Sequence, residues 1–262
     1  MRIALTIAGS DSGGGAGIQA DLKTFQRFGV FGVSAITAIT AQNTRGVAQW
    51  EAVSPALVRA QIDAIAEDLP PAAFKTGMLA NAAVASTVAA AIRDHSFHNY
   101  VLDPVMVATS GDVLFERDTL DVIRDDLVPQ AFLVTPNLQE AKLLLDQEIE
   151  DEDGMARAAE RIVTEMGAQA ALIKGGHLES GDRVVDVLFD GDVRTFRGRR
   201  LSSKSTHGTG CTLSAAIAAH LARGESLHAA VRRAIDYVHN AIATAPGLGS
   251  GNGPLNYLAD EG

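Results

Sequence analysis

The chain has very little cysteine, since Cys211 is the only one among its 262 residues. A single thiol excludes an internal disulfide bond, and the Cys and His residues do not follow a zinc-ligand spacing. Long apolar runs are also missing, because none approaches the roughly 20 residues that a membrane span requires. The apolar start at residues 2–8 breaks at Gly9 and is too short for the core of a signal peptide. We therefore expect a soluble, cytoplasmic protein.

Positive charge is scarce as well. The chain has 22 Lys and Arg against 32 Asp and Glu, which gives a formal net charge of -10. This balance argues against a surface that binds nucleic acid by neutralising phosphates. The one dense basic cluster, at residues 197–200, is interpreted as a loop. Apolar residues make up 47% of the chain, enough for a large core, and the pattern contains no linker or repeat, so we expect a single domain over residues 1–262.

Short apolar runs alternate with helical patterns along most of the chain, which predicts an α/β fold with a mainly parallel sheet. Asp190-Gly191-Asp192 between two β-rich runs predicts a hairpin, which we place at an antiparallel edge. Helices are expected to begin after Ser54, with Ser54 as N-cap, and to cover about 81–93 and 227–243. The expected buried strands cover residues 3–8, 33–39, 73–79, 99–106, 132–137 and 170–177.

The glycine-rich loop at residues 9–17 matches neither common phosphate-binding motif. The GxxxxGK[ST] motif needs a lysine after its last glycine, and the GxGxxG fingerprint needs glycine at position 18, which is Ile18. We interpret the loop as a close backbone approach to a ligand. Asp11 and Asp21 flank it as candidate hydrogen-bonding groups, although a solvated or helix-turn Asp is the commoner role of either.

Polar side chains follow several of the expected strands at the points where they end. They are Asp103, Asn137 with Glu140, and Lys174. Because ligands of open parallel sheets bind outside the carboxyl ends of the strands, we expect these residues to share one crevice with the turn at Cys211.

The turn at residues 203–212 leads directly into an alanine-rich apolar segment and so predicts a helix that begins near Cys211. The first N–H groups of such a helix are unpaired and converge on one point, which favours an anion. A helix N-terminus also favours the thiolate form of a cysteine. Equally, a lone cysteine before an alanine-rich helix is commonly a small buried apolar residue. The turn alone leaves both interpretations open.

Seven short motifs in fixed order make the chain resemble the hydroxymethylpyrimidine/phosphomethylpyrimidine kinases of thiamine biosynthesis. They are AGSDSGGGAGIQADLKT (8–24), TAQNT (40–44), KTGML (75–79), LDPVM (102–106), TPNLQEA (135–141), KGGH (174–177) and THGTGCT (206–212). The resemblance implies a ribokinase-like three-layer sandwich, in which a mainly parallel sheet has helices on both faces and a small antiparallel edge hairpin. It also implies ATP-dependent phosphorylation of 4-amino-5-hydroxymethyl-2-methylpyrimidine and then of its monophosphate, and a homo-oligomer, with a dimer favoured.

The resemblance also implies roles for the turn residues. Cys211 stands where many ribokinase-like enzymes have an Asp that acts as base toward the substrate hydroxyl, and a thiolate can serve in the same way. Gly208, Thr209 and Gly210 are expected to offer backbone N–H groups to the transferring phosphoryl group. Whether Cys211 takes the proton or only positions the hydroxyl is left open.

The nucleotide and its metal ion are expected at the strand ends. Glu140 and Asp103 are the candidate groups for Mg²⁺, which keeps much of its hydration shell and accepts carboxylates through water. Asn137, Lys174 and Thr206 are the candidates for ATP. The alternative roles are structural: Glu140 as an ordinary first-turn glutamate, Asp103 as a strand-end cap and Lys174 as a solvated loop residue.

The pyrimidine is expected at Gln42, whose amide offers both a donor and an acceptor to the ring nitrogen and the exocyclic amine. Asp21, Met78 and Gly9 are the further candidates for the same pocket. The alternatives are a solvated Gln42 at a strand end and Met78 as core filler.

Three other functions compete with the pyrimidine kinase. Pyridoxal kinase shares the fold and the loop chemistry, and dual activity is compatible with the motifs. A Cys-His hydrolase that uses Cys211 and His207 lacks a third member and leaves Asn137 and Glu140 without a role. A pyrimidine sensor without turnover is disfavoured by the presence of Cys211, Glu140 and Lys174.

Overall fold

The computed structural model describes residues 1–106, 117–176 and 182–260. Within these residues one sheet contains nine strands in the order β3-β2-β1-β4-β5-β6-β7-β8-β9. The strands from β2 to β7 run parallel, while β3 at one edge and the β8–β9 hairpin at the other run antiparallel. The strands are β1 (Ile3–Asp11), β2 (Phe31–Asn43), β3 (Gly46–Ala52), β4 (Ala73–Thr76), β5 (Tyr100–Leu102), β6 (Leu133–Val134), β7 (Ala171–Lys174), β8 (Arg183–Phe189) and β9 (Val193–Arg199).

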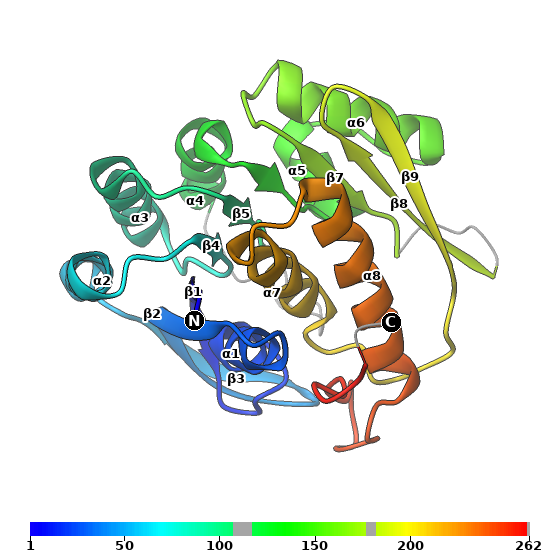
Figure 1. The fold of residues 1–262 in the computed structure, drawn as a ribbon, viewed down its shortest axis with the longest axis horizontal. Coiled ribbons are helices and arrows are strands. Elements are labelled where there is room, and N and C mark those ends of the chain that lie inside the picture. Colours follow the sequence, from blue (N-terminus) through cyan, green and yellow to red (C-terminus); the bar gives the residue numbers. More distant parts are fainter. Residues whose placement is uncertain (107–116, 177–181, 261–262) are drawn as a thin grey trace.

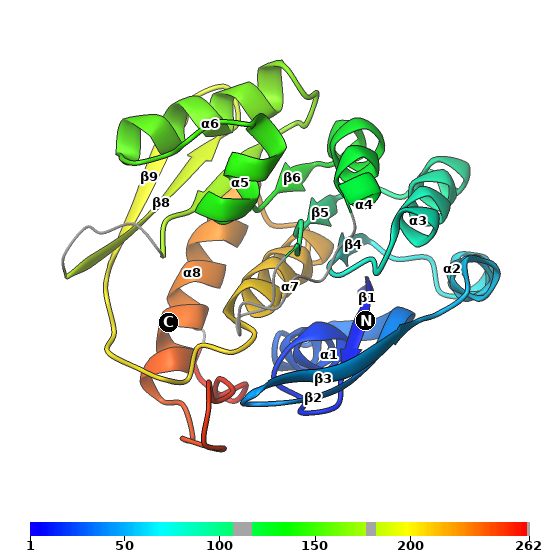
Figure 2. The same ribbon diagram turned by 180° about the vertical axis from the view of Figure 1, so that it is seen from behind.

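Helices cover both faces of this sheet, as Figures 1 and 2 show. One layer contains α1, α7 and α8, and the other contains α2 to α6. The expected three-layer α/β fold is therefore confirmed. The helices are α1 (Gly17–Arg27), α2 (Pro55–Asp68), α3 (Ala82–His95), α4 (Arg117–Val122), α5 (Leu138–Leu145), α6 (Glu152–Thr164), α7 (Thr209–Ala222) and α8 (Leu227–Ala243). A π-helical turn (Ile123–Leu127) and a 3-10 turn (Val128–Gln130) continue α4.

Helix α7 lies at the centre of one layer, against β1, β4 and β5 and between α1 and α8. Every residue from Thr212 to Ala222 is buried. A helix that is apolar all round belongs in the interior of a protein, and its many alanines allow neighbouring elements to approach closely. The first turn of α7, which carries Cys211, is therefore held by the best-buried helix of the structure.

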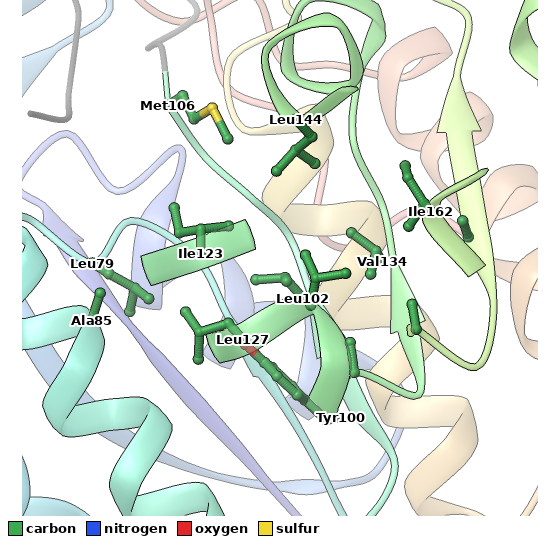
Figure 3. Packing of buried hydrophobic residues seen from close by; sticks show 14 of the residues in the cluster. Leu79, Ala85, Tyr100, Leu102, Met106, Ile123, Leu127, Val134, Leu144 and Ile162 are labelled. Carbon is green, nitrogen blue, oxygen red and sulfur yellow. The ribbon is translucent and has the colours of Figure 1, made fainter. Parts of the chain in front are cut away.

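The second layer rests on a large apolar cluster between the sheet and α2 to α6, part of which is shown in Figure 3. Tyr100 of β5 stacks on Phe74 of β4 with 4.6 Å between ring centroids. Because β1, β4, β5 and β6 are covered on both sides, most of their side chains are apolar, with Thr6, Lys75 and Thr76 among the buried polar exceptions. Packing on both sides fixes the positions of the carboxyl ends of these strands. The polar residues of the candidate site follow directly after those ends.

The structure confirms some local expectations and corrects others. Ser54 caps α2 by accepting a hydrogen bond from the Leu57 N–H, and α8 covers the expected 227–243. The strand expected at 33–39 is longer, since β2 continues to Asn43 through most of the polar stop at 40–44, because pairing with β3 extends it. The basic cluster at 197–200 is not a loop, since residues up to Arg199 belong to β9 and pair with β8. In the part of the chain that the structure describes, no helix is long and apolar enough to cross a membrane.

Candidate functional site

A cavity of about 1010 Å³ opens at the carboxyl ends of the parallel strands, the edge where a doubly wound sheet binds ligands. The structure brings twelve of the thirteen sequence-predicted site residues to its wall. They are Gly9, Gln42, Met78, Asp103, Asn137, Glu140, Lys174, Thr206, Gly208, Thr209, Gly210 and Cys211. The expectation of one shared crevice is therefore met. His177, at the end of the KGGH motif, lies outside the described residues.

Asp21 is the exception, because it does not line the cavity. It is fully buried on α1 and forms an ion pair with Lys75 of β4, with Asp21 Oδ2 3.2 Å from Lys75 Nζ. Thr6 donates a further hydrogen bond to Asp21 Oδ2 at 2.6 Å. The carboxylate of Asp21 is thus paired with a buried cation and is not placed to contact a ligand in this cavity directly.

Lys75 is one residue whose role sequence reasoning missed. It is fully buried in the short strand β4, between Phe74 and Thr76. Burial by itself lowers the pKa of Lys75, but Asp21, Cys211 and Asp103 outweigh this effect and hold that pKa above its ordinary value. A lysine inside a buried strand needs a carboxylate partner, so its position was the available signal.

The first turn of α7 is shaped by glycine. Gly208 is its N-cap with φ of 80°, and a Cβ at this residue would lie 1.8 Å from the Gly15 carbonyl oxygen. No side chain caps this turn, and the Thr209 N–H donates weakly to the Thr206 carbonyl at 3.3 Å, so the turn presents its N–H groups where an anion can bind. A Cβ built on Gly210 would lie 3.3 Å from Lys174 Nζ, so the turn and the Lys174 ammonium are close neighbours.

Lys174, which lies next to Gly210, contacts two buried carboxylates. Its Nζ lies 2.8 Å from Asp103 Oδ1 and 3.8 Å from Glu140 Oε2. Burial raises the pKa of Asp103, but Lys174 and Lys75 outweigh that effect and keep it below its ordinary value. For Glu140, burial together with the charge of Asp103 raises the pKa to about 7, although Lys174 offsets part of this rise. The cluster is thus a cation held between two acidic groups.

Asn137 and Glu140 also form a capping box at the start of α5. The Glu140 N–H donates to Asn137 Oδ1 at 2.9 Å, and the Asn137 N–H donates to Glu140 Oε2 at 2.8 Å. The structural role considered for Glu140 is therefore present in addition to its place in the cavity wall. Reciprocal capping fixes both side chains at the edge of the site, where one oxygen of Glu140 faces Lys174.

Asp11 organises the glycine-rich loop. Its carboxylate accepts hydrogen bonds from the N–H groups of Gly13, Gly15 and Ala16 at 2.8, 3.0 and 2.8 Å. It also lies 2.8 Å from His207 Nε2. His207 therefore pairs with Asp11, which weakens the Cys-His hydrolase interpretation, since that chemistry needs the imidazole on Cys211. The pair joins the glycine-rich loop to the turn before α7.

Cys211 lies at the third position of α7 and is partly exposed to the cavity. The expectation that the helix N-terminus favours its thiolate is not met. Desolvation by the surrounding protein raises the pKa of the Cys211 thiol to about 11, and Asp21 and Asp103 add to this rise while Lys75 opposes it. The thiol is thus protonated at neutral pH in the free protein.

We expect the alkylation rate of Cys211 by iodoacetamide to keep rising up to about pH 11, because the thiolate is the reactive form. An ordinary free thiol reaches its plateau above its pKa of about 8.5. Intact-protein mass measures the rate, and the single cysteine makes every thiol adduct report on Cys211. A small cysteine peptide is the control, and circular dichroism at each pH confirms folding. A plateau below pH 9 contradicts the expectation.

Two basic residues at the far end of the cavity were not expected there. Arg199 and Arg200 line its wall at the end of β9, and Arg200 Nη1 donates to the Gly176 carbonyl at 2.8 Å. Asp186 of β8 faces the same region, and burial raises its pKa to about 6. Only the pairing of β8 with β7 brings these residues to the site, so local sequence gave no signal for them.

Comparison with known proteins agrees with this geometry. The family model described as phosphomethylpyrimidine kinase matches residues 11–256. A hydroxymethylpyrimidine/phosphomethylpyrimidine kinase of Rhizobium meliloti is 52% identical over 261 residues, covering 98% of this chain and 97% of the relative. The thiamine biosynthesis bifunctional protein ThiED of Geobacter sulfurreducens is 49% identical over 97% of this chain, which spans only 52% of that longer protein.

Solved structures show the same fold. A pyridoxal kinase of Bacillus subtilis in an ADP complex has a TM-score of 0.90 and 38% identity, covering 99% of this chain and 98% of that one. A pyridoxal kinase of Staphylococcus aureus with AMP-PCP and pyridoxal also reaches 0.90, at 32% identity over 99% and 94%. A phosphomethylpyrimidine kinase of Clostridium difficile has a TM-score of 0.83 and 38% identity, over 92% and 100%. This chain belongs to the phosphomethylpyrimidine kinase family.

Proposed function

We propose that the protein uses ATP to phosphorylate the hydroxymethyl group of 4-amino-5-hydroxymethyl-2-methylpyrimidine, and then the resulting monophosphate to the diphosphate, as a step of thiamine biosynthesis. One observation carries the proposal. The α7 turn that contains Cys211 lies in a single cavity with Lys174 and Asp103 and with Gln42 and Met78. The turn can bind an anion, and it lies between the charged groups of Lys174 and Asp103 on one side and the Gln42 amide on the other. This arrangement suits transfer of a phosphoryl group to a small alcohol.

The nucleotide is assigned to the side of Lys174, Asn137 and Thr206. Related kinases bind ADP or AMP-PCP, and the basic wall at Arg199 and Arg200 adds positive charge at that end. Lys174 would offset the charge that develops on the transferring phosphoryl group, and the N–H groups of Thr209 and Gly210 would bind its oxygens.

Mg²⁺ fits the acidic pair of Asp103 and Glu140. Within the described ranges no group of three or more His, Cys, Asp and Glu side chains is arranged to hold a metal ion. Two carboxylates completed by water and nucleotide phosphates are nevertheless what Mg²⁺ prefers. When bound, the ion supplies neutralisation of phosphate charge. Glu140, with its pKa near 7, is then in the right range to ionise as a cation approaches.

Cys211 is assigned to the acceptor hydroxyl. Because its thiol is protonated at neutral pH, its first task is to hold the hydroxyl by hydrogen bonding at the α7 turn. Phosphoryl transfer passes through a loose transition state that depends mainly on position and charge, so a preformed thiolate is not required.

Gln42 is assigned to the aminopyrimidine ring. Replacement of Gln42 by alanine is expected to raise KM for the pyrimidine about tenfold, the effect of losing one or two hydrogen bonds in a closed site, with a smaller change in kcat. Steady-state kinetics with saturating Mg-ATP measure this split. A KM within twofold of the wild-type value would remove Gln42 from the binding site.

The test of the function is an incubation with the pyrimidine alcohol and Mg-ATP, with mono- and diphosphate followed by mass. Pyridoxal is assayed beside it, because two structures of TM-score 0.90 are pyridoxal kinases and dual activity is the second candidate function. We expect phosphorylation of the pyrimidine at a higher kcat/KM than pyridoxal. Absence of both mono- and diphosphate would overturn the proposal.

The assembly and location of the protein remain predictions. We expect a homo-oligomer, most simply a dimer, in the cytoplasm, with no nucleic-acid partner because of the net charge of -10. Light scattering coupled to gel filtration measures the oligomer, with a mass near 55 kDa expected for a dimer of the 27.4 kDa chain (2 × 27.4 = 54.8).

A further inference from the structure

The side-chain amide of Gln42 lies between two polar neighbours in the cavity wall. Its Oε1 lies 3.3 Å from Thr40 Oγ1, and its Nε2 lies 3.4 Å from His207 Nε2. A half-turn of the amide exchanges oxygen and nitrogen without changing the shape of the side chain, so the surrounding donors and acceptors decide its orientation. Both neighbours are themselves bound to other groups, and those bonds fix what each can offer to Gln42.

His207 Nε2 cannot accept a hydrogen bond from Gln42. Asp11 Oδ2 lies 2.8 Å from His207 Nε2, and that carboxylate already accepts the N–H groups of the glycine-rich loop. These bonds outweigh the effect of burial and hold the pKa of Asp11 below its ordinary value. An ionised carboxylate accepts and never donates, so His207 Nε2 carries the proton whether the ring is neutral or charged. An N–H of Gln42 at this end would face the N–H of His207, so only the amide oxygen is compatible, sharing the proton that His207 directs mainly at Asp11.

Thr40 can only accept a hydrogen bond from Gln42. Its hydroxyl lies 2.8 Å from the Ser10 carbonyl oxygen, which cannot donate, so the single proton of Thr40 is used there. The lone pairs of Oγ1 can still accept a hydrogen bond, but the hydroxyl has no second proton to donate. The end of Gln42 that faces Thr40 must then be a donor. The two neighbours sit at opposite ends of the amide and require the same orientation.

We propose that Thr40 and the Asp11–His207 pair act as positioning residues that hold the Gln42 amide with Oε1 toward His207 and Nε2 toward Thr40. One lone pair of Oε1 and one N–H of Nε2 are left for a ligand in the cavity, in a fixed spatial order. The site therefore selects a ligand by the order of donor and acceptor along its edge. A ligand with the reverse order leaves buried polar groups unpaired and is rejected.

This selection rests on the proposed function, in which Gln42 faces the pyrimidine. The 4-amino compound presents an exocyclic donor beside an acceptor ring nitrogen. The 4-oxo analogue, 5-hydroxymethyl-2-methylpyrimidin-4-one in its N3–H form, presents an acceptor beside a donor. The two have nearly the same shape, so the ratio of their kcat/KM values reports the orientation of the amide. A general loosening of the site lowers both values and leaves the ratio unchanged.

The experiment measures this ratio for the wild type and four variants. Thr40→Val and His207→Gln each remove one of the two constraints, and we expect each to lower the amino-over-oxo preference about tenfold, the effect of one hydrogen bond at a closed site. Thr40→Ser keeps the hydroxyl and should keep the preference. Thr24→Val is the matched control, because the Thr24 hydroxyl also donates to a backbone carbonyl, at 2.8 Å, but lies on α1 outside the cavity wall.

A second measurement needs neither a variant nor the reaction. In the ¹⁵N-labelled wild-type protein, the Gln42 side-chain amide protons should show stronger nuclear Overhauser contacts to Thr40 than to the His207 ring, and the reverse order of intensity would overturn the assignment. An unchanged preference in both Thr40→Val and His207→Gln overturns it as well. If the wild type phosphorylates neither pyrimidine, the proposed function fails while the nuclear Overhauser contacts still decide the orientation.

Discussion

Replacement of Lys174 by methionine is expected to lower kcat by about 10²–10³-fold, the usual effect of removing one preorganised group that stabilises a developing charge. Lys174 Nζ lies 2.8 Å from Asp103 Oδ1 and beside Gly210 at the start of α7, so its charge reaches the point where the phosphoryl group would transfer. Methionine keeps most of the length and volume of the side chain and removes the charge together with the hydrogen bond to Asp103. Single-turnover kinetics at saturating ATP measure the chemical step directly.

The control for this variant separates catalysis from folding. Without Lys174, Asp103 and Glu140 lose the ammonium that lies between them and only Lys75 still acts on Asp103, so the pKa of Asp103, now held below its ordinary value, would rise. Thermal melts with and without Mg²⁺ show how much stability is lost, and we expect added Mg²⁺ to restore part of it. A folded Lys174→Met protein with wild-type kcat would exclude Lys174 from the reaction.

Replacement of Cys211 by alanine is expected to lower kcat about 10²-fold, which is the low end of the range for a group that handles the reacting proton. We expect the low end because the thiol is protonated in the free protein and acts first by holding the hydroxyl. The variant contains no thiol at all, so any residual activity cannot come from another cysteine. Rates are measured with pyrimidine alcohol and Mg-ATP, with substrate affinity determined separately.

Serine and aspartate at position 211 distinguish the two roles left open for the thiol. Serine can hold the hydroxyl but is a poor base, whereas aspartate can take the proton but is larger and charged. If positioning dominates, Cys211→Ser should retain more activity than Cys211→Asp, and the reverse order would indicate proton removal. Wild-type turnover in Cys211→Ala would remove both roles.

The local sequence pattern was sufficient to predict most of the helices and strands. The helix over 227–243 follows from its apolar periodicity, and the cap at Ser54 from the Ser-Pro pair at the start of α2. The edge hairpin follows from Asp190-Gly191-Asp192, since that turn tolerates positive φ and Gly191 has φ of 110°. Strand β3 was missed because its residues are half exposed and acquire strand geometry only by pairing with β2.

The sequence by itself determined the fold class, the family resemblance and the set of polar residues at the strand ends. These depend on periodicity and on short motifs, both of which are local properties of the chain. It also placed Cys211 at the start of a helix, and the structure has it at the third position of α7.

Only the tertiary structure decided which charged groups meet. Asp21 pairs with Lys75 across 54 residues and Asp11 with His207 across 196, so neither pair is visible in a local pattern. The same applies to the Cys211 thiol, where burial and the approach of Asp21 and Asp103 outweigh the helix N-terminus and Lys75. Protonation and hydrogen-bond direction depend on distances between side chains from distant segments, and packing against the shared sheet sets those distances.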